Sequence, residues 1–296
     1  ICSPNHLHKT MALAAIEAGK PVYCEKPLAL SAADAEEMVI AAEKAGVKTM
    51  VGFNYAKNPA AALVREIIQS GELGELVRFR GTHNEDYLSD PAEPFNWRCD
   101  RQLSGSGALG DVGAHILHMA VELMGPISEL CADLRTVIPE RRLPGDSSRK
   151  RAVENEDEAS ALVRFANGAS GTIETSRIAV GRKMGLTYEI TGSHGSVLFD
   201  QERMSEIQLY IADGPRGRRG FRTILLGPEH PDYASFSPAP GHGLGFNDMK
   251  IVEARDLVAG IVHGAPIKTD FRSAWEINRL IDGIERSHAD GGWVSP

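Results

Sequence analysis

The first 54 residues alternate between short apolar segments and alanine-rich amphipathic ones. Residues 21–24 and 47–53 predict strands, and residues 1–3 predict the end of an earlier strand. Residues 6–18 and 31–45 predict helices, and each is followed by a glycine that can end it. The order strand, helix, strand, helix, strand at this spacing is typical of a βαβαβ unit, so we expect a parallel sheet here.

Beyond Gly74 the pattern changes to runs of strands with few helices between them. Helices are predicted at residues 59–70, 109–124, 247–262 and 272–287, and residues 227–245 predict a long loop. Asn167-Gly168 is a strong hairpin signal. Strands are predicted at residues 77–83, 158–165, 169–178, 186–191, 196–200, 206–212 and 221–226, with an extended segment at 127–138. This pattern predicts an α+β domain with an open, mainly antiparallel sheet and helices on one face.

These two patterns predict two domains, with residues 1–54 in the first and residues 55–296 in the second. A parallel sheet covered on both faces needs more chain than the first domain has. A sheet edge beginning at Ile1 would also be left unpaired. We therefore expect the first domain to be the C-terminal remainder of a larger α/β domain.

Composition narrows the class of protein. The chain has 296 residues, 42% of them hydrophobic, and a net charge of -8. No segment has the length of a membrane span and no signal peptide is visible, and an acidic chain does not favour nucleic acid. The four cysteines show no metal-binding spacing. These features predict a cytoplasmic enzyme with reduced thiols and no bound metal.

Three polar residues are candidates for acid–base chemistry. Lys26 follows a predicted strand, at the edge where α/β sheets bind ligands. Asp111 and His115 are four residues apart on a predicted helix and would share one face. A carboxylate beside an imidazole fixes its tautomer, and a histidine is the usual general base. A surface lysine and a solvated helical pair are the competing interpretation.

Other residues are weaker candidates. His118 would extend the face of Asp111 and His115 into a metal triad, or it would be buried or point at substrate. His242 lies in the long predicted loop, where it could contact substrate or be an ordinary loop residue. Tyr55, Trp97 and Tyr87 could line a sugar pocket or belong to the core.

Four motifs, taken in order, give the chain a resemblance to a known family. They are residues 3–8, Glu25-Lys26-Pro27, residues 52–59, and the glycine-rich segment 107–115 that ends in His115. Together they resemble the glucose-fructose oxidoreductase, inositol dehydrogenase and rhizopine catabolism (Gfo/Idh/MocA) family over almost the whole chain. The resemblance implies that the first domain is the remainder of a Rossmann domain. It also implies that the second domain binds substrate and mediates oligomerisation, with its last helices packing back toward the first.

The resemblance also implies roles for individual residues. His115 would be the general base, Lys26 would polarise the reacting oxygen, and Asp111 would position substrate and support His115. The Lys26–Pro27 peptide would be cis. Substrate contacts would come from Tyr55, Trp97, His118 and His242. Contacts to NAD or NADP would come from Ser3, Pro4, Asn5, His8, Glu25, Lys26 and Asn54.

Two departures from the family pattern bear on these roles. The family usually has an aspartate three residues after the histidine, where this chain has His118. The chain also lacks the family's G-x-G-x-x-G turn, which holds the cofactor pyrophosphate at a helix N-terminus. The first departure puts the substrate in doubt, and the second leaves half of a cofactor site in this chain.

The resulting prediction is an NAD(P)-dependent oxidoreductase that moves a hydride between a sugar, polyol or cyclitol hydroxyl and nicotinamide. Its partner would be a small sugar or polyol, with no nucleic acid and no membrane, and it would form a homodimer or homotetramer. Two alternatives stay open. One is an NAD-assisted glycoside hydrolase or lyase on the same scaffold, and the other is a truncated sugar-binding protein without activity.

Overall fold

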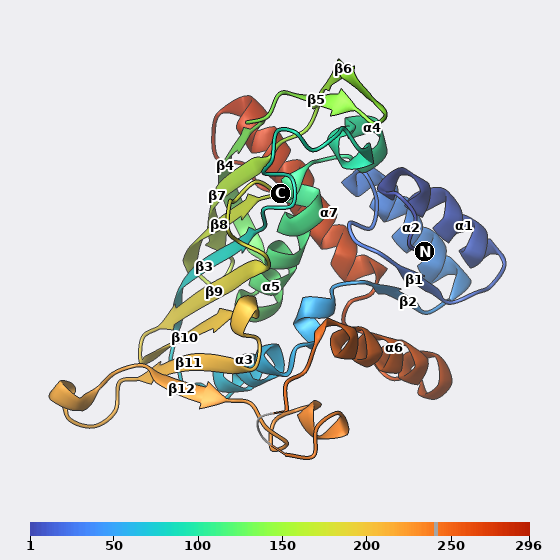
Figure 1. Ribbon diagram of the computed structural model, residues 1–296. Coiled ribbons are helices and arrows are strands. Elements are labelled where there is room, and N and C mark those ends of the chain that lie inside the picture. Colours follow the sequence, from blue (N-terminus) through green and yellow to red (C-terminus); the bar gives the residue numbers. More distant parts are fainter. Residues whose placement is uncertain (240–241) are drawn as a thin grey trace.

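The N-terminal part of the chain is a small parallel α/β unit. The computed structural model describes residues 1–239 and 242–296, and Figure 1 shows their arrangement. Strands β1 (Val22–Cys24) and β2 (Thr49–Val51) pair in parallel, as predicted. Helices α1 (His8–Glu17) and α2 (Ala32–Ala45) pack beside them. No strand covers residues 1–3, but the Ile1 amine donates to the Tyr23 carbonyl at 2.6 Å, so this segment still lies along β1.

The second part is built on an eight-stranded sheet whose order is β12-β11-β10-β9-β3-β8-β7-β4. Neighbouring strands are antiparallel except for β3 and β8, which are parallel. This confirms the open, mainly antiparallel sheet. The strands are β3 (Leu76–Asn84), β4 (Ile127–Arg135), β7 (Glu158–Phe165), β8 (Ser170–Ser176), β9 (Gly185–Gly192), β10 (Gly195–Asp200), β11 (Glu206–Ile211) and β12 (Arg222–Leu225).

One face of this sheet is covered by helices and the other is open. Helices α3 (Pro59–Gln69), α5 (Ala114–Met124) and α7 (Phe271–Asp290) lie on the same side of it (Figure 1). In β7 the residues alternate along the strand, so that Ala159, Ala161 and Val163 are buried while Leu162 is 52% exposed. Period-two alternation of this kind places one apolar face against the helices and leaves the other to solvent.

The last two helices reach the N-terminal unit. Helix α7 contacts α2 through Ala32, whose N–H donates to Asp282 Oδ2 at 2.9 Å, and through an Arg272–Glu43 ion pair of 2.6 Å. Helix α6 (Phe246–His263) contacts β1 through a hydrogen bond of 2.7 Å from Tyr23 to Glu253. These contacts fix the edge of the small sheet against the large domain.

The structure also differs from the predicted elements in several other places. A hairpin of β5 (Glu140–Leu143) and β6 (Asp146–Ala152) was not predicted, because its charged sequence has no apolar alternation. The helix predicted at residues 109–124 begins with a π-helical turn, η4 (Leu109–Gly113), ahead of α5. Short helical segments also occur at η1 (Asn5–Leu7), η2 (Asn54–Lys57), η3 (Trp97–Cys99), α4 (Arg101–Ser104), η5 (Gln201–Arg203), η6 (Arg216–Arg218) and η7 (Tyr233–Ser235).

Two broader observations complete the fold. None of the helices in the described ranges combines the length and the apolar character that crossing a bilayer requires. The four cysteines, Cys2, Cys24, Cys99 and Cys131, are all free thiols.

Candidate active site

A cavity of about 400 Å³ lies where the N-terminal unit meets the large domain. Lys26 enters it from the segment after β1, and Tyr55 from η2. The end of β3 contributes His83, and the helical segment after residue 108 contributes Asp111 and His115. All three residues predicted to carry the chemistry therefore line one cavity.

Lys26 and Asp111 form the central ion pair of the cavity. The Lys26 Nζ lies 3.0 Å from Asp111 Oδ1 and also donates to the Asp111 backbone carbonyl. The Lys26–Pro27 peptide is cis, as predicted. An ammonium group has three N–H donors, so these two bonds leave one for a ligand in the cavity.

The Asp111 carboxylate is held on its other oxygen as well. Tyr87 donates its hydroxyl to Oδ2, and the Arg98 Nε lies 3.1 Å from the same atom. Burial acts to raise the pKa of Asp111, but the charges of Lys26 and Arg98 and the hydrogen bonds from Tyr87 and Lys26 outweigh it. The pKa of this carboxyl group therefore lies well below its usual range, and the group stays ionised.

His115 is a buried imidazole with only 6% of its surface exposed. Burial is the largest cause that lowers its pKa well below 6.5, followed by the positive charge of Lys26. The Tyr55 ring packs edge-on against it with 4.6 Å between ring centroids. Its Nδ1 is buried and has no partner among the described residues, whereas Nε2 is not among these buried atoms, so Nε2 is the nitrogen that a ligand in the cavity can reach. The imidazole is neutral at physiological pH and can accept a proton.

Asp111 does not support His115 in the way that the sequence spacing suggested. Its carboxylate bonds Lys26, Tyr87 and Arg98, and none of the hydrogen bonds between described residues joins it to His115. Asp111 lies in the π-helical turn Leu109–Gly113. Its carboxylate is taken up by Lys26, Tyr87 and Arg98, which come from other segments of the chain.

Two further groups in the cavity were missed from the sequence. His83 is 1% exposed, and its Nε2 lies 3.1 Å from Glu85 Oε1. Lys250, on α6, lies 3.0 Å from Glu25 Oε1. The available signal was weak, because His83 and Glu85 are two polar residues at the end of a predicted strand and Lys250 is one charge on a helix.

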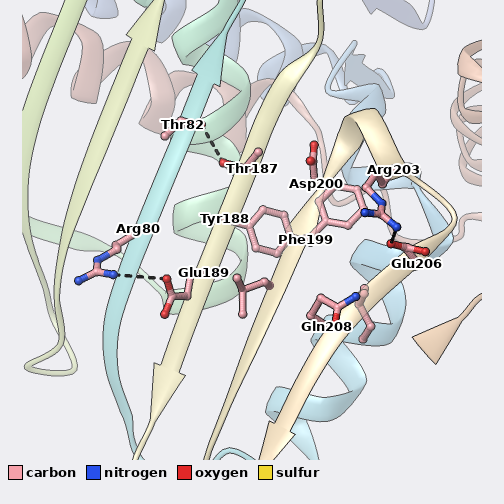
Figure 2. A pocket seen from close by; sticks show the side chains of 12 residues that line it. Arg80, Thr82, Thr187, Tyr188, Glu189, Phe199, Asp200, Arg203, Glu206 and Gln208 are labelled. Atoms are coloured by element: carbon pink, nitrogen blue, oxygen red, sulfur yellow. Dashed lines mark hydrogen bonds and ion pairs between the residues drawn. The ribbon is translucent and has the colours of Figure 1, made fainter. Parts of the chain in front are cut away.

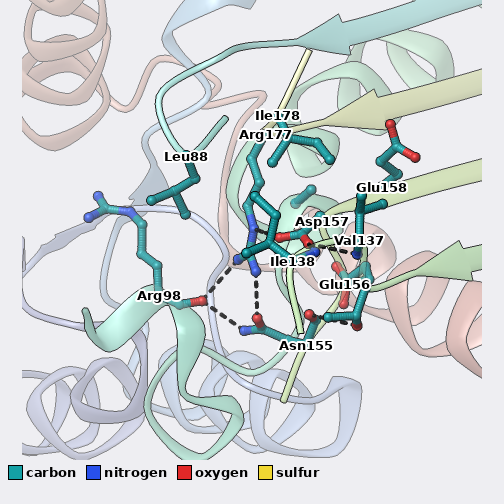
Figure 3. Close-up of polar contacts among 12 residues, drawn as sticks. Leu88, Arg98, Val137, Ile138, Asn155, Glu156, Asp157, Glu158, Arg177 and Ile178 are labelled. Carbon is teal, nitrogen blue, oxygen red and sulfur yellow. Dashed lines mark hydrogen bonds and ion pairs between the residues drawn. The ribbon is translucent and has the colours of Figure 1, made fainter. Parts of the chain in front are cut away.

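A buried polar network lies beneath Arg98 (Figure 3). Arg177 and Asp157 form an ion pair of 2.9 Å in which both side chains are fully buried. Arg177 also donates to the Arg98 carbonyl at 3.0 Å and to Asn155 Oδ1 at 2.9 Å. Asn155 donates to the same Arg98 carbonyl at 2.8 Å. The network thus fixes the backbone from which the Arg98 side chain reaches Asp111.

The N-terminal residues predicted to contact cofactor fall into two groups. Glu25, Lys26 and Asn54 line the cavity. Ser3, Pro4, Asn5 and His8 do not line it, and two of them serve the local structure. Asn5 donates to the Ser104 carbonyl at 2.9 Å, and His8 is fully buried between the carbonyls of Pro27 and Ser3.

The four residues predicted to contact substrate also differ in whether they line the cavity. Tyr55 lines the cavity, but Trp97, His118 and His242 do not. Trp97 packs under the Arg98 guanidinium at 4.6 Å from its ring centroid. His118 stacks on Phe53 with 4.2 Å between centroids, and burial lowers its pKa to about 4. His242 is exposed, with its Nδ1 3.2 Å from the Ala239 carbonyl.

The residues near the cavity fit the nicotinamide end of a dinucleotide. The side-chain nitrogen of Asn54 and the hydroxyl of Ser3 are buried polar atoms without partners among the described residues. Such atoms are costly unless a ligand or water satisfies them. Both residues are in the N-terminal unit, close in sequence to the strand ends. Among the described residues, no group of three or more His, Cys, Asp or Glu is placed to hold a metal ion.

A second hollow, of about 380 Å³, lies on the open face of the large sheet (Figure 2). Its rim carries polar pairs, including Arg80 and Glu189 at 3.4 Å and the hydroxyls of Thr82 and Thr187 at 2.8 Å. It belongs to a sheet surface, and it brings together none of the residues of the first cavity.

Comparison with known proteins identifies related sequences along the whole chain. Residues 1–53 match the family model described as an oxidoreductase family with an NAD-binding Rossmann fold, and residues 61–198 match the GFO/IDH/MocA C-terminal domain. Levoglucosan dehydrogenase from Pseudarthrobacter phenanthrenivorans is 40% identical, over 99% of this chain and 78% of that protein.

Solved structures give the same result. The structure of levoglucosan dehydrogenase in complex with NADH and levoglucosan superimposes with a TM-score of 0.95 at 41% identity, over 99% of this chain and 78% of that one. An NAD-binding oxidoreductase from Klebsiella pneumoniae has a TM-score of 0.94 at 46% identity and the same coverage.

Proposed function

Because this chain belongs to the GFO/IDH/MocA family of NAD-binding oxidoreductases, we propose that it oxidises a hydroxyl group of a neutral sugar or polyol with His115 as the general base. The observation that carries the proposal is the meeting of Lys26, Asp111 and His115 in one cavity. A neutral buried imidazole beside a paired lysine is suited to taking a proton from an alcohol.

The proposed mechanism uses each group once. The substrate hydroxyl donates its proton to His115 Nε2, and the remaining N–H of Lys26 donates to the same oxygen as negative charge develops on it. Asp111 stays ionised and holds the Lys26 ammonium in place. Asn54 and Glu25 would hold the nicotinamide end of the cofactor. When bound, that cofactor would accept the hydride from the carbinol carbon.

The charges of the cavity favour a neutral substrate. Lys26 and Arg98 are both paired with Asp111, and Lys250 is paired with Glu25. A phosphate or carboxylate on the substrate would find no unpaired cation among these lining residues and would compete with two acidic groups. The 40% identity to levoglucosan dehydrogenase makes levoglucosan the first substrate to test.

The test is a substrate panel with the protein that carries this chain. Levoglucosan, L-sorbose, myo-inositol and a sugar phosphate would each be supplied with NAD+ and separately with NADP+, and nicotinamide absorbance would be followed. Net formation of reduced cofactor with a neutral sugar supports the proposal. Turnover of a glycoside without net reduction would instead identify the hydrolase or lyase alternative, and binding without turnover would identify the sugar-binding one.

The proposal includes a homodimer or homotetramer formed through the open face of the large sheet. Leu162 and Leu225 are 52% and 67% exposed on strands of this sheet. Helices cover the other face of the sheet, so this is the face that a second copy of the chain can reach (Figure 1). The hollow shown in Figure 2 lies on the same face.

A further inference from the structure

The cavity contains two imidazoles that each have one nitrogen without a partner. The Nδ1 atoms of His83 and His115 are both buried, and neither makes a hydrogen bond among the described residues. The two rings lie 5.6 Å apart between centroids, tilted by 48°. An unpaired buried polar atom is costly, so two of them on neighbouring rings need an explanation.

The hydrogen-bond partners assign opposite roles to these two nitrogens. His83 Nε2 lies 3.1 Å from a carboxylate oxygen of Glu85, which can only accept, so Nε2 carries the proton and Nδ1 has the lone pair. In His115 the proton and the lone pair are on the opposite nitrogens. A general base needs its lone pair on Nε2, the nitrogen that a ligand can reach, and a neutral imidazole then carries its proton on Nδ1. The unpaired Nδ1 of His115 is thus a donor, and the unpaired Nδ1 of His83 is an acceptor.

We propose that His83, oriented by Glu85, is the positioning residue of the general base: it accepts a hydrogen bond from His115 Nδ1–H when the two rings turn toward each other. The bond holds His115 in the tautomer with a free Nε2 and stabilises the imidazolium that forms when the substrate proton arrives. Glu85 and His83 therefore take the part that the sequence suggested for Asp111. The inference rests on the proposed function, because it assumes that His115 is the base.

Other groups near the two rings set the electrostatic background. Glu85 and the Tyr55 ring face His83, the latter with 5.8 Å between centroids. The charges of Lys26 and Lys250 and the imidazoles of His83 and His118 act on His115, all in the direction that disfavours a proton there. An acceptor on His115 Nδ1 opposes this effect, which gives the cavity a way to carry the imidazolium transiently.

The direct experiment determines the two tautomers in the 296-residue chain without cofactor. Long-range proton–nitrogen NMR correlations would be recorded near neutral pH, with the His83 and His115 signals assigned from the spectra of His83→Asn and His115→Asn. The expected result is a proton on Nε2 of His83 and on Nδ1 of His115. A proton on Nδ1 of His83, or on Nε2 of His115, would overturn the proposal.

Steady-state kinetics, measured with NAD+ added to the protein, give the second readout. His83→Phe keeps a ring and removes the acceptor, so kcat should fall about 10- to 100-fold with KM little changed. The acid limb of the pH profile should also move to lower pH, because the His115 imidazolium loses a stabilising bond. His83→Asn places an amide oxygen near the Nδ1 position and should restore part of kcat. A purely structural role would lower the rate equally at all pH values and would show no such rescue.

Two controls separate the possible failures. Asp133→Asn breaks an imidazole–carboxylate pair of similar geometry, 3.2 Å to His288, outside the cavity and should leave the kinetics unchanged. His115→Asn should abolish turnover. If His115→Asn abolishes turnover but His83→Phe leaves kcat unchanged, only the positioning role of His83 is wrong. If His115→Asn remains active, the proposed function itself fails.

Discussion

The Lys26 ammonium lies 3.0 Å from the Asp111 carboxylate, although 85 positions separate the two residues in the sequence. Lys26 comes from the segment after β1 and Asp111 from the turn before α5, so the pair joins the two parts of the chain. Lys26 also donates to the Asp111 backbone carbonyl, and the Asp111 carboxylate also accepts from Tyr87 and Arg98. The pair is therefore both a tether between the domains and the polar centre of the site.

Replacing the carboxylate should disable the lysine. Asp111→Asn removes the charge that holds Lys26 and Arg98, and a misplacement of about 1 Å can cost about 100-fold in rate. We expect kcat to fall by at least about tenfold, measured as initial rates with a saturating sugar. Asp86→Asn is the matched control, because Asp86 pairs with Lys183 at 2.6 Å outside the cavity. Equal rates for both variants would show that Asp111 does not act through Lys26.

Acid should destabilise the fold through its buried histidines. The pKa values of His8, His115 and His118 are all lowered, mainly by burial, and that of His118 falls to about 4. The folded chain then binds fewer protons than the unfolded chain, so stability is full above pH 6.5 and is lost as pH falls toward the folded pKa values. His118 alone should contribute roughly 3 kcal/mol to this loss.

Urea unfolding between pH 7 and pH 4.5 measures the effect. In His118→Gln the dependence of the unfolding free energy on pH should be shallower than in the parent chain. Identical slopes for the two proteins would contradict a neutral buried His118.

Breaking the buried ion pair should cost far more than breaking an exposed one. Asp157→Asn leaves the Arg177 charge uncompensated in the interior, which should lower the unfolding free energy by about 3–5 kcal/mol. Glu129→Gln removes the exposed Arg164–Glu129 pair of 2.7 Å and should cost at most about 1 kcal/mol. Chemical unfolding of both variants provides the comparison. Similar losses in the two would show that the interior pair has no special role.

A charge on the open sheet face should weaken association. Leu162 lies on β7 with 52% of its surface exposed, and Leu162→Arg would place a cation in the proposed interface. We expect the mass measured by light scattering to fall toward that of one chain. Val180→Arg is the control, since Val180 is 85% exposed but lies outside the strands. An unchanged mass for Leu162→Arg would exclude this face as the interface.

The sequence was informative wherever local pattern determines structure. Alternation identified the strands of the large sheet, and the short motifs identified Lys26, Asp111 and His115 as neighbours. The partners of Asp111 could not be predicted from its spacing to His115, because Tyr87 and Arg98 reach its carboxylate only in the folded chain. The role proposed for Glu85 could not be predicted either. It depends on His83 lying beside His115, and that contact between β3 and α5 forms only in the folded chain.

The network under Arg98 has a consequence for which changes this chain can accommodate. Arg177 and Asn155 both bond the carbonyl oxygen of residue 98, and neither bonds its side chain. The interior therefore holds the main chain at this position whatever the side chain is. A substitution at residue 98 should therefore alter the wall of the cavity and remove one partner of Asp111, while the main chain at this position stays in place.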